Sequence, residues 1–258
     1  MKIVRNPAVY LVGRQCVNHD EVARFLQAHD VSHWSTDTLL ASEFLPEIAG
    51  RLCYMSFAKP RPGGNRAYLD HIKEVGHGSV LEHSVWNFII TGVSRSFTHE
   101  LVRHRAGWGY SQLSQRYVDE SVAEFVEPEC IADNPELHEV WRDAVSNAQA
   151  AYIKLVEGLQ ARFADVEDRT LRRKMARQAA RSVLPNATET KIFVTANARA
   201  LRHFIELRCN EHAETEIRAV AAMILGILQK EAPNLFGDYE LFALPDGTRA
   251  ARTKYIKV

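Results

Sequence analysis

The chain has 258 residues, 46% of them hydrophobic and 25% charged, which is an ordinary composition for a globular protein and fits a single domain over residues 1–258. Basic and acidic side chains number 32 each, and this zero net charge argues against a general binder of nucleic acid or of anionic membranes. No uncharged apolar run approaches the length of a membrane span, so no membrane segment is expected.

Apolar periodicity and turn residues divide the chain into strands and helices. In chain order they predict a strand over 2–12, a helix over 37–53, a loop at Lys59–Asn65, a turn over 76–83, a strand over 83–92, a helix after Ser94, a strand over 112–118, helices over 136–163 and 168–182, a strand over 188–196, and helices over 198–209 and 211–231. Ser94 is expected to cap its helix, with Phe97, Leu101 and Val102 turned inward. The expected fold class is α+β (mixed α/β): a central β-sheet flanked by helices, with a mostly helical segment over 136–182.

One short stretch concentrates side chains that are able to bind anions. Arg103, His104 and Arg105 stand in a row just past a predicted helix, and Ser114 and Arg116 follow them. Uncompensated charge is costly to bury, so such a cluster normally faces water or an anion. A solvated helix end would explain an isolated Arg-His-Arg triplet, but the downstream serine and arginine favour an anion site.

A second polar group lies where the predicted strand over 188–196 meets the next helix. Asn197 stands near the helix start, and Arg199, His203 and Arg208 follow at spacings of four and five, roughly along one face. Polar groups at such a junction suit an anion or a flavin-like heterocycle. An amphipathic helix with a wet polar face is the structural alternative, and spacing alone favours it.

The histidines and cysteines do not form a metal-binding pattern. His99 and His104 lie five residues apart, so on a helix they diverge by about 140°, and no metal site is expected. The four cysteines are scattered, which is typical of reduced thiols. Together with an N-terminus that lacks a signal-peptide core, this predicts a cytoplasmic location. Cys209 is expected to be a buried, inert thiol.

Taken together, these segments resemble the flavin-dependent thymidylate synthases, the ThyX family. That family's hallmark is Arg-His-Arg, about seven further residues, a serine, and an arginine two positions later, matched here by residues 103–105, Ser114 and Arg116. Segments 76–83, 98–103, 181–185 and 197–212 match as well, in the same order. One departure is that eight residues, Ala106–Leu113, precede the motif serine, and the glycines among them are able to absorb the extra residue as a bulge or turn.

The resemblance implies an activity and a set of site residues. The activity is synthesis of dTMP from dUMP, with 5,10-methylenetetrahydrofolate as carbon donor, FAD as hydride carrier and NADPH as reductant, in a homotetramer whose sites are shared between subunits. The residues implied for FAD are Ser79, Arg103, His104, Arg105, Gln112, Asn197, Arg199 and His203. Those implied for dUMP are Glu100, Arg103, Gln112, Ser114, Gln115, Arg116, Arg181 and Arg208. Arg208 is the implied catalytic residue, which faces the uracil and favours its N3-ionised form by electrostatic stabilisation.

The residues alone leave two other classes of function open. An arginine-rich nucleic-acid-binding module without catalysis would use the same clusters, although the zero net charge opposes it, and its affinity for DNA would fall steeply with salt. An interaction scaffold would simply keep its polar helix faces wet. Colour separates these classes, because only a flavoprotein purifies yellow.

Overall fold

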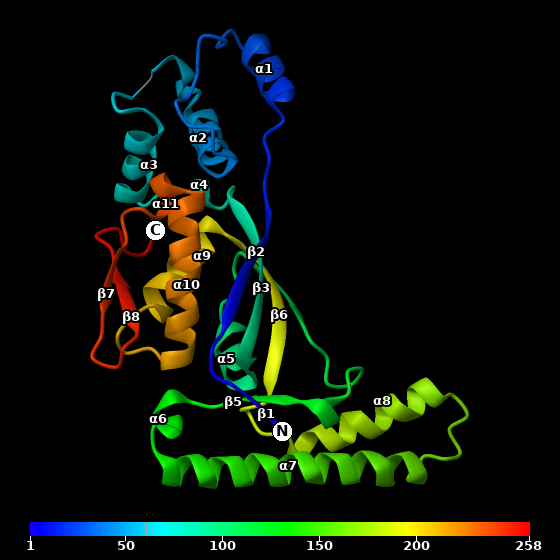
Figure 1. Cartoon of the computed structure of the whole chain (residues 1–258). Coiled ribbons are helices and arrows are strands. Elements are labelled where there is room, and N and C mark those ends of the chain that lie inside the picture. The colour runs from blue at the N-terminus through cyan, green and yellow to red at the C-terminus, as the bar shows by residue number, and fades with distance from the viewer. Residues whose placement is uncertain (60) are drawn as a thin grey trace. The chain divides into compact units, whose positions relative to one another are not determined.

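The computed structural model describes residues 1–59 and 61–258, and the chain forms two compact units (Figure 1). The first unit comprises Met1–Ala8, Ile90–Arg103 and Ser111–Phe193, and the second comprises Val9–Ile89, His104–Tyr110 and Val194–Val258. Each unit is therefore assembled from segments that are far apart in the sequence. Pro60, which belongs to the loop predicted from residue 59 to residue 65, lies outside the described residues.

Helices dominate the first unit. Its elements are β1 (Lys2–Val4), α5 (Arg95–Leu101), the 3-10 helix η2 (Glu120–Val122), β5 (Glu124–Val126), α6 (Glu129–Ala132), α7 (Pro135–Arg162), α8 (Arg169–Ala180) and the 3-10 helix η3 (Arg181–Val183). Asn134 caps α7 by accepting hydrogen bonds from the N–H groups of Glu136 and Leu137 at 3.0 and 3.2 Å. α7 and α8 pack side by side (Figure 1), which confirms the helical segment predicted for the middle of the chain.

The second unit contains most of a four-stranded sheet in the order β2-β3-β6-β4. Its strands are β2 (Ala8–Arg14), β3 (Val85–Ser94), β6 (Glu189–Asn197) and β4 (Trp108–Gln112), each of which also has residues in the first unit. The helices of this unit are α1 (His19–Ala28), α2 (Ala41–Tyr54), the 3-10 helix η1 (Ser56–Ala58), α3 (Gly64–Glu74), α4 (Gly78–Leu81), α9 (Ala198–Arg208), α10 (Thr215–Glu231) and α11 (Pro233–Phe236), followed by the hairpin strands β7 (Glu240–Ala243) and β8 (Arg249–Arg252). Trp86 on β3 and Phe236 on α11 are fully buried and meet edge to face, with ring centroids 5.8 Å apart. A central sheet with helices packed against it confirms the predicted α+β class.

The strand predicted over 2–12 is two strands. β1 ends at Val4, and β2 begins directly after Pro7, which has no N–H group to donate to a strand ladder. β1 pairs in parallel with β5, whereas β2 joins β3 in the four-stranded sheet. The proline therefore divides one apolar run between two sheets.

The strand predicted over 112–118 lies earlier in the chain. β4 ends at Gln112, and the chain then turns, because the Ser114 carbonyl accepts hydrogen bonds from the N–H groups of Tyr117 and Val118 at 3.1 and 3.0 Å. The apolar residues of this stretch do not mark a strand, since both Tyr117 and Val118 are exposed.

The capped helix after Ser94 is confirmed as α5. The Ser94 hydroxyl accepts a hydrogen bond from the Phe97 N–H at 3.0 Å, and Phe97 and Leu101 are buried. Val102, predicted to point inward, is instead 38% exposed, because α5 already ends at Leu101. The turn predicted over 76–83 also contains α4, a short helix that its glycines did not indicate.

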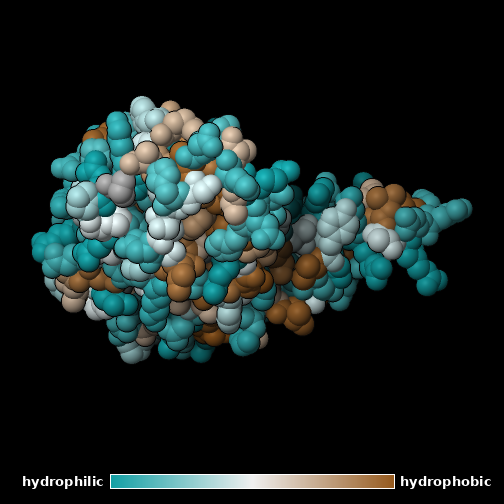
Figure 2. All heavy atoms as spheres, turned by 90° about the horizontal axis from the view of Figure 1, so that it is seen from above, coloured by the Kyte–Doolittle hydropathy of each residue, from teal (hydrophilic) through white to brown (hydrophobic). Residues whose placement is uncertain are grey.

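Hydrophilic residues cover most of the face shown in Figure 2, with hydrophobic residues interspersed. Within residues 1–59 and 61–258, no helix combines the length and the apolar character needed to cross a bilayer. Some charged side chains are buried beneath this surface. Burying an unpaired charge is costly, so each of them needs a bonded partner of opposite charge.

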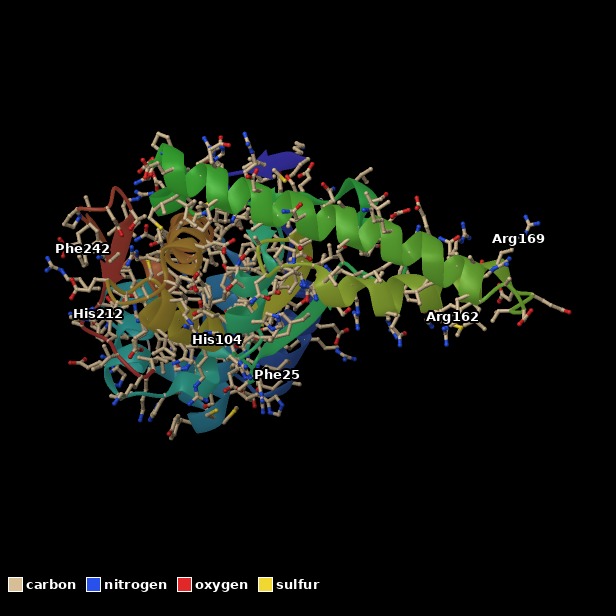
Figure 3. The ribbon with its side chains drawn as sticks, turned by 90° about the horizontal axis from the view of Figure 1, so that it is seen from below. Phe25, His104, Arg162, Arg169, His212 and Phe242 are labelled. Carbon is tan, nitrogen blue, oxygen red and sulfur yellow. The ribbon has the colours of Figure 1, made fainter. Side chains whose placement is uncertain are left out.

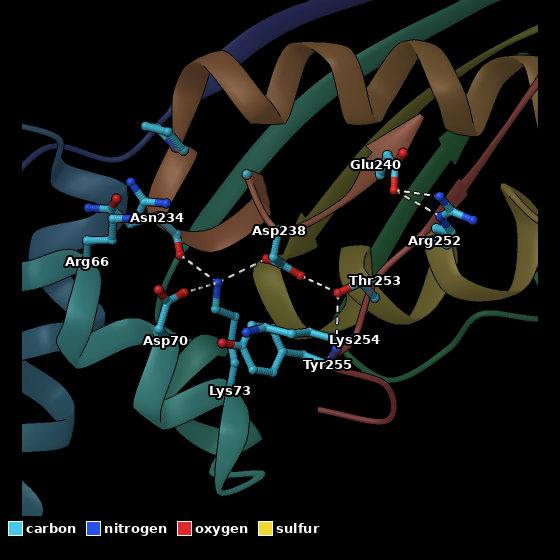
Figure 4. A pocket seen from close by; sticks show the side chains of 12 residues that line it. Arg66, Asp70, Lys73, Asn234, Asp238, Glu240, Arg252, Thr253, Lys254 and Tyr255 are labelled. Atoms are coloured by element: carbon cyan, nitrogen blue, oxygen red, sulfur yellow. Dashed lines mark hydrogen bonds and ion pairs between the residues drawn. The ribbon is translucent and has the colours of Figure 1, made fainter. Parts of the chain in front are cut away.

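Lys73, Arg202 and Asp238 form such a buried network in the second unit. Lys73 Nζ lies 2.9 Å from a carboxylate oxygen of Asp70, from one of Asp238 and from the Asn234 carbonyl (Figure 4). Arg202 binds the same Asp238 through two hydrogen bonds of 2.8 and 2.9 Å. Burial alone would raise the pKa of Asp238, but the hydrogen bond and charge of Arg202, together with the charge of Lys73, lower it to about 2.

Asp238→Asn is therefore expected to lower the free energy of unfolding and to weaken its acid dependence. The unfolded carboxyl titrates near pH 3.9, so the folded state binds fewer protons below that pH. The ionised Asp238 carboxylate contributes about 2 kcal/mol to the free energy of unfolding. This contribution is complete above about pH 5 and is lost as the pH falls toward 2. Urea titrations of the wild type and of Asp238→Asn between pH 2 and pH 7 measure the difference in the free energy of unfolding. Glu240→Gln is the matched control: its partner Arg252 and the carboxylate are both largely exposed, so its effect should stay below about 0.5 kcal/mol.

Candidate active site

The predicted site residues form two sets, one in each unit. The first unit holds Glu100, Arg103, Gln112, Ser114, Gln115, Arg116 and Arg181. The second unit holds Ser79, His104, Arg105, Asn197, Arg199, His203 and Arg208. The division follows the ligands: except for Arg103 and Gln112, the residues implied for FAD lie in the second unit, and except for Arg208, those implied for dUMP lie in the first.

Of the three residues at 103–105, only His104 is buried, with 7% of its surface exposed. Arg103 and Arg105 are exposed, as predicted for a cluster that faces water or an anion, but that prediction is wrong for His104. Its imidazole packs edge to face on Phe204 of α9, with ring centroids 5.2 Å apart. Figure 3 shows the labelled His104 beside α9. The carbon edge of an imidazole is apolar, so packing against an aromatic ring partly offsets the loss of contact with water.

Two of the polar residues predicted on α9 meet His104. Arg208 Nε donates a hydrogen bond to His104 Nε2 at 3.2 Å, and the ring of His203 lies 5.8 Å from the His104 ring between centroids. Because both residues meet His104, the contacts support the prediction that His203 and Arg208 lie on one face of α9. Arg199, one turn before His203, instead forms an ion pair with Glu82 at 2.6 Å.

Asn197 begins α9 and ties it to the motif segment. Its side-chain oxygen accepts a hydrogen bond from the Ala200 N–H at 2.9 Å, and its own N–H donates to the Gly107 carbonyl at 3.1 Å. Gly107 has a φ of +75° and lies in a turn closed by the bond from the Trp108 N–H to the Arg105 carbonyl, at 3.3 Å. The longer segment before the motif serine therefore contains a turn that a glycine permits.

Gly107→Ala is expected to destabilise the protein by about 1–3 kcal/mol and to weaken flavin binding. A Cβ at this position would lie 2.6 Å from Asn197 Nδ2 and 2.8 Å from the Ala200 Cβ, in addition to the strain of a positive φ. Thermal unfolding and a flavin titration measure the two effects. Gly109→Ala is the control, because its added Cβ would meet only Thr195, at an ordinary 3.7 Å. Equal unfolding temperatures for the two variants would contradict the proposed crowding.

In the second unit, Arg199 of α9 lies against α4, which contains Ser79. A Cβ on Gly78 would lie 2.7 Å from Arg199 Nε, so the guanidinium lies against backbone next to Ser79. Ser79 is exposed, and the Arg199 and Glu82 side chains are each about half exposed, at 47% and 45%. A half-exposed guanidinium beside an exposed hydroxyl suits a phosphate group.

In the first unit, Gln112 is held in place by two hydroxyl groups. Its side-chain nitrogen donates to Thr98 Oγ1 at 3.0 Å and to Thr190 Oγ1 at 3.3 Å. Thr98 lies on α5, two residues before Glu100. Arg103 follows this helix, and its N–H donates a hydrogen bond to the Glu100 carbonyl at 3.2 Å. These bonds connect the end of β4 to the end of α5.

Ser114, Gln115 and Arg116 form the turn after β4. Ser114 Oγ accepts a hydrogen bond from the Arg116 N–H at 3.4 Å, and Gln115 is buried. The Arg116 guanidinium lies over the ring of Tyr117, 5.8 Å from its centroid. A planar cation on an aromatic face is restrained in orientation.

Arg95 lies beside this turn and was missed by the sequence analysis. Its side chain approaches the Leu113 carbonyl at 3.5 Å, and its N–H donates to the Thr188 carbonyl at 3.0 Å. Burial lowers the pKa of Arg95, the charge of Glu120 raises it, and the positive charge of Arg181 lowers it further. Arg95 thus lies within electrostatic range of a carboxylate, Glu120, and of a second guanidinium, Arg181, and two neighbouring guanidinium groups are able to bind an anion together. In the sequence, Arg95 is marked only by its place after a helix cap, which does not indicate a ligand.

A hollow of about 720 Å³ in the second unit contains no predicted site residue. It is lined by Arg66, Asp70, Lys73, Pro233, Asn234, Gly237, Asp238, Glu240, Arg252, Thr253, Lys254 and Tyr255 (Figure 4). Its carboxylates are already bound by cations, so we assign it no part in the candidate site. Among the described residues, no group of three or more His, Cys, Asp or Glu side chains is arranged to hold a metal ion.

Comparison with known proteins decides the family. The profile of a family described as "Thymidylate synthase complementing protein" matches residues 36–234. The chain is 52% identical to the flavin-dependent thymidylate synthase of Mycobacteroides abscessus and to that of Mycobacterium avium, in each case over 88% of this chain and 90% of the relative. The chain belongs to the flavin-dependent thymidylate synthase family. The matched residues 36–234 of this synthase-family chain include every predicted site residue.

A solved structure supports the fold of this flavin-dependent thymidylate synthase family member. The UMP/dUMP methylase PolB from Streptomyces cacaoi, bound with 5-Br dUMP, superposes with a TM-score of 0.66 at 21% sequence identity. The superposition covers 92% of this chain and 96% of that one. The architecture is thus shared over nearly the whole length of both proteins.

Proposed function

We propose that this chain is a thymidylate synthase that converts dUMP to dTMP, with FAD as hydride carrier, 5,10-methylenetetrahydrofolate as carbon donor and NADPH as reductant. The carrying observation is Arg95 in the first unit, whose guanidinium approaches the Leu113 carbonyl beside the turn that holds Ser114 and Arg116, within electrostatic range of Arg181. A nucleoside monophosphate presents a dianion, and guanidinium groups with a serine hydroxyl are its usual protein donors.

The second unit offers groups that fit FAD. The half-exposed guanidinium of Arg199 and the exposed Ser79 would hold phosphate oxygens, and the amide of Asn197 and the exposed His203 would contact the remainder. Gly107 supports this fit, because its missing side chain leaves Asn197 in place at the start of α9. Bound FAD would supply the hydride chemistry, while the protein orients the reacting rings.

Arg208 would stabilise negative charge on the uracil ring. Its guanidinium does not lose its proton, so it acts electrostatically and not as a general base. The neighbouring Cys209 would take no part, since burial raises the pKa of its thiol to about 11 and keeps it protonated at neutral pH. Such a reaction needs no cysteine nucleophile.

We also propose that the two units form one catalytic domain over residues 1–258 and that four chains assemble into a tetramer with shared sites. The family match supports the first point, because residues 36–234 span segments of both units. A cytoplasmic location fits the cysteines, which are free thiols at Cys16, Cys53, Cys130 and Cys209. Folate and NADPH would enter as small-molecule co-substrates.

Reconstitution of the purified protein tests the proposal. It is expected to bind one FAD per chain, to oxidise NADPH faster when dUMP is present, and to form dTMP only when 5,10-methylenetetrahydrofolate, NADPH and dUMP are all supplied. Well-folded protein that fails to bind FAD in a titration would remove the assignment. Retention on DNA that weakens steeply with salt, without any flavin, would favour the nucleic-acid-binding alternative.

A further inference from the structure

The contact between Arg208 and His104 fixes the state of the histidine. Arg208 Nε carries a hydrogen and donates it to His104 Nε2 at 3.2 Å. A ring nitrogen accepts a hydrogen bond only when it carries no proton itself. His104 must therefore be neutral, with its proton on Nδ1, because a cationic ring would offer no acceptor and would place a second positive charge beside the guanidinium.

The surroundings of His104 hold its ring in this orientation. The ring centroids of Trp108 and Phe204 lie 6.0 and 5.2 Å from that of His104, and little of the residue is exposed. The Tyr110 hydroxyl donates to the His104 carbonyl at 2.6 Å, and the rings of Tyr110 and Trp108 stack at 5.7 Å with an angle of 7° between them. Both aromatic residues of β4 thus restrain the same histidine.

We propose that His104 is a positioning residue for Arg208: it anchors Nε of the guanidinium, so that the terminal Nη groups are directed at the pyrimidine. This role rests on the proposed function and goes beyond the FAD contact that the family resemblance implies for His104. Among the N–H groups of the Arg208 guanidinium, the one on Nε is held by His104. Fixing that one group restricts rotation of the Arg208 side chain. A guanidinium that must meet developing negative charge in one orientation requires such restriction.

A double-mutant cycle separates this role from a contact to FAD. We would measure kcat and KM for dUMP at saturating FAD for the wild type, His104→Leu, Arg208→Ala and the double variant. His104→Leu is expected to lower kcat/KM about tenfold to a hundredfold, as the loss of a hydrogen bond to a charged group typically does. In the Arg208→Ala background the same change should cost less than about twofold, because its target is already absent.

Two further variants make the cycle decisive. His104→Gln places an amide oxygen near the position of Nε2, so it keeps an acceptor for Arg208 and should recover most of the activity that His104→Leu loses. His203→Leu removes a ring from the same helix face and should reduce activity by the same factor with and without Arg208. Equal losses for His104→Leu in both backgrounds, or no rescue by glutamine, would overturn the positioning role.

Nitrogen-15 NMR tests the contact without any turnover. The ring assigned to His104, identified by its absence in His104→Gln, should show a protonated Nδ1 and a bare Nε2 at neutral pH. Arg208→Ala should shift the Nε2 resonance, and Lys254→Ala should not. A proton on Nε2 in the wild type would overturn the inference. A wild type that shows the expected tautomer and the Arg208 shift but makes no dTMP would instead contradict the proposed function alone.

Discussion

Arg208→Ala is expected to lower the rate of dTMP formation by about 10²–10³, which is the typical cost of losing one donor aimed at developing negative charge. The reacting pyrimidine gains electron density, and a guanidinium fork is able to meet it with two N–H groups at once. Binding of FAD should change little, because Arg208 is not among the residues implied for FAD and all of those stay intact. Quenched-flow measurement of dTMP, together with a flavin titration of the same preparation, gives both quantities.

Two comparisons make the Arg208 result specific. Arg208→Lys should recover little activity, since an ammonium is a point charge and does not reproduce the fork or the Nε–H that meets His104. Arg66→Ala removes an exposed arginine of the same unit, which lines a hollow without any predicted site residue, and should keep the rate within about twofold. Near-normal turnover in either Arg208 variant would remove this residue from the active centre.

The sequence predicted local structure well where the cause is local. An apolar repeat predicted the helix over 136–163 and a polar cap predicted the helix after Ser94, and the structure contains both. Prediction failed where a distant partner decides. The run over 2–12 divides at Pro7, and its first part pairs with β5, more than a hundred residues later.

The candidate site shows the same division between local and distant causes. A motif identifies His104 and Arg208 as polar residues near a ligand, but no spacing rule relates positions 104 residues apart, so their hydrogen bond was not predictable. Arg95 was missed for a similar reason, because its significance comes from Arg181 and Glu120, which chain folding brings near it. The burial of His104 depends on Phe204, a residue of another element.

The distribution of the two residue sets motivates the last prediction. Most residues implied for dUMP belong to the first unit, whereas Arg208 belongs to the second. A protein of this size without a separate dinucleotide-binding domain is able to enlarge its site by sharing it across a symmetric subunit interface. Arg181 acts electrostatically on Arg95 beside the Ser114 turn of its own chain, so we expect Ser114, Arg116 and Arg181 of one subunit to meet Arg208 of another at the same dUMP.

Arg116→Ala and Arg208→Ala chains, each inactive alone, are therefore expected to regain activity when they are unfolded, mixed and reassembled into the same tetramers. In a random one-to-one mixture half of the chains keep each arginine. About a quarter of the shared sites then receive Arg116 from one chain and Arg208 from another, and dTMP synthesis should recover to about a quarter of the wild-type rate. Differently tagged chains and tandem purification verify that the tetramers are mixed, and each variant reassembled alone supplies the baseline. Mixed tetramers without recovered synthesis would show that each site takes both arginines from one chain.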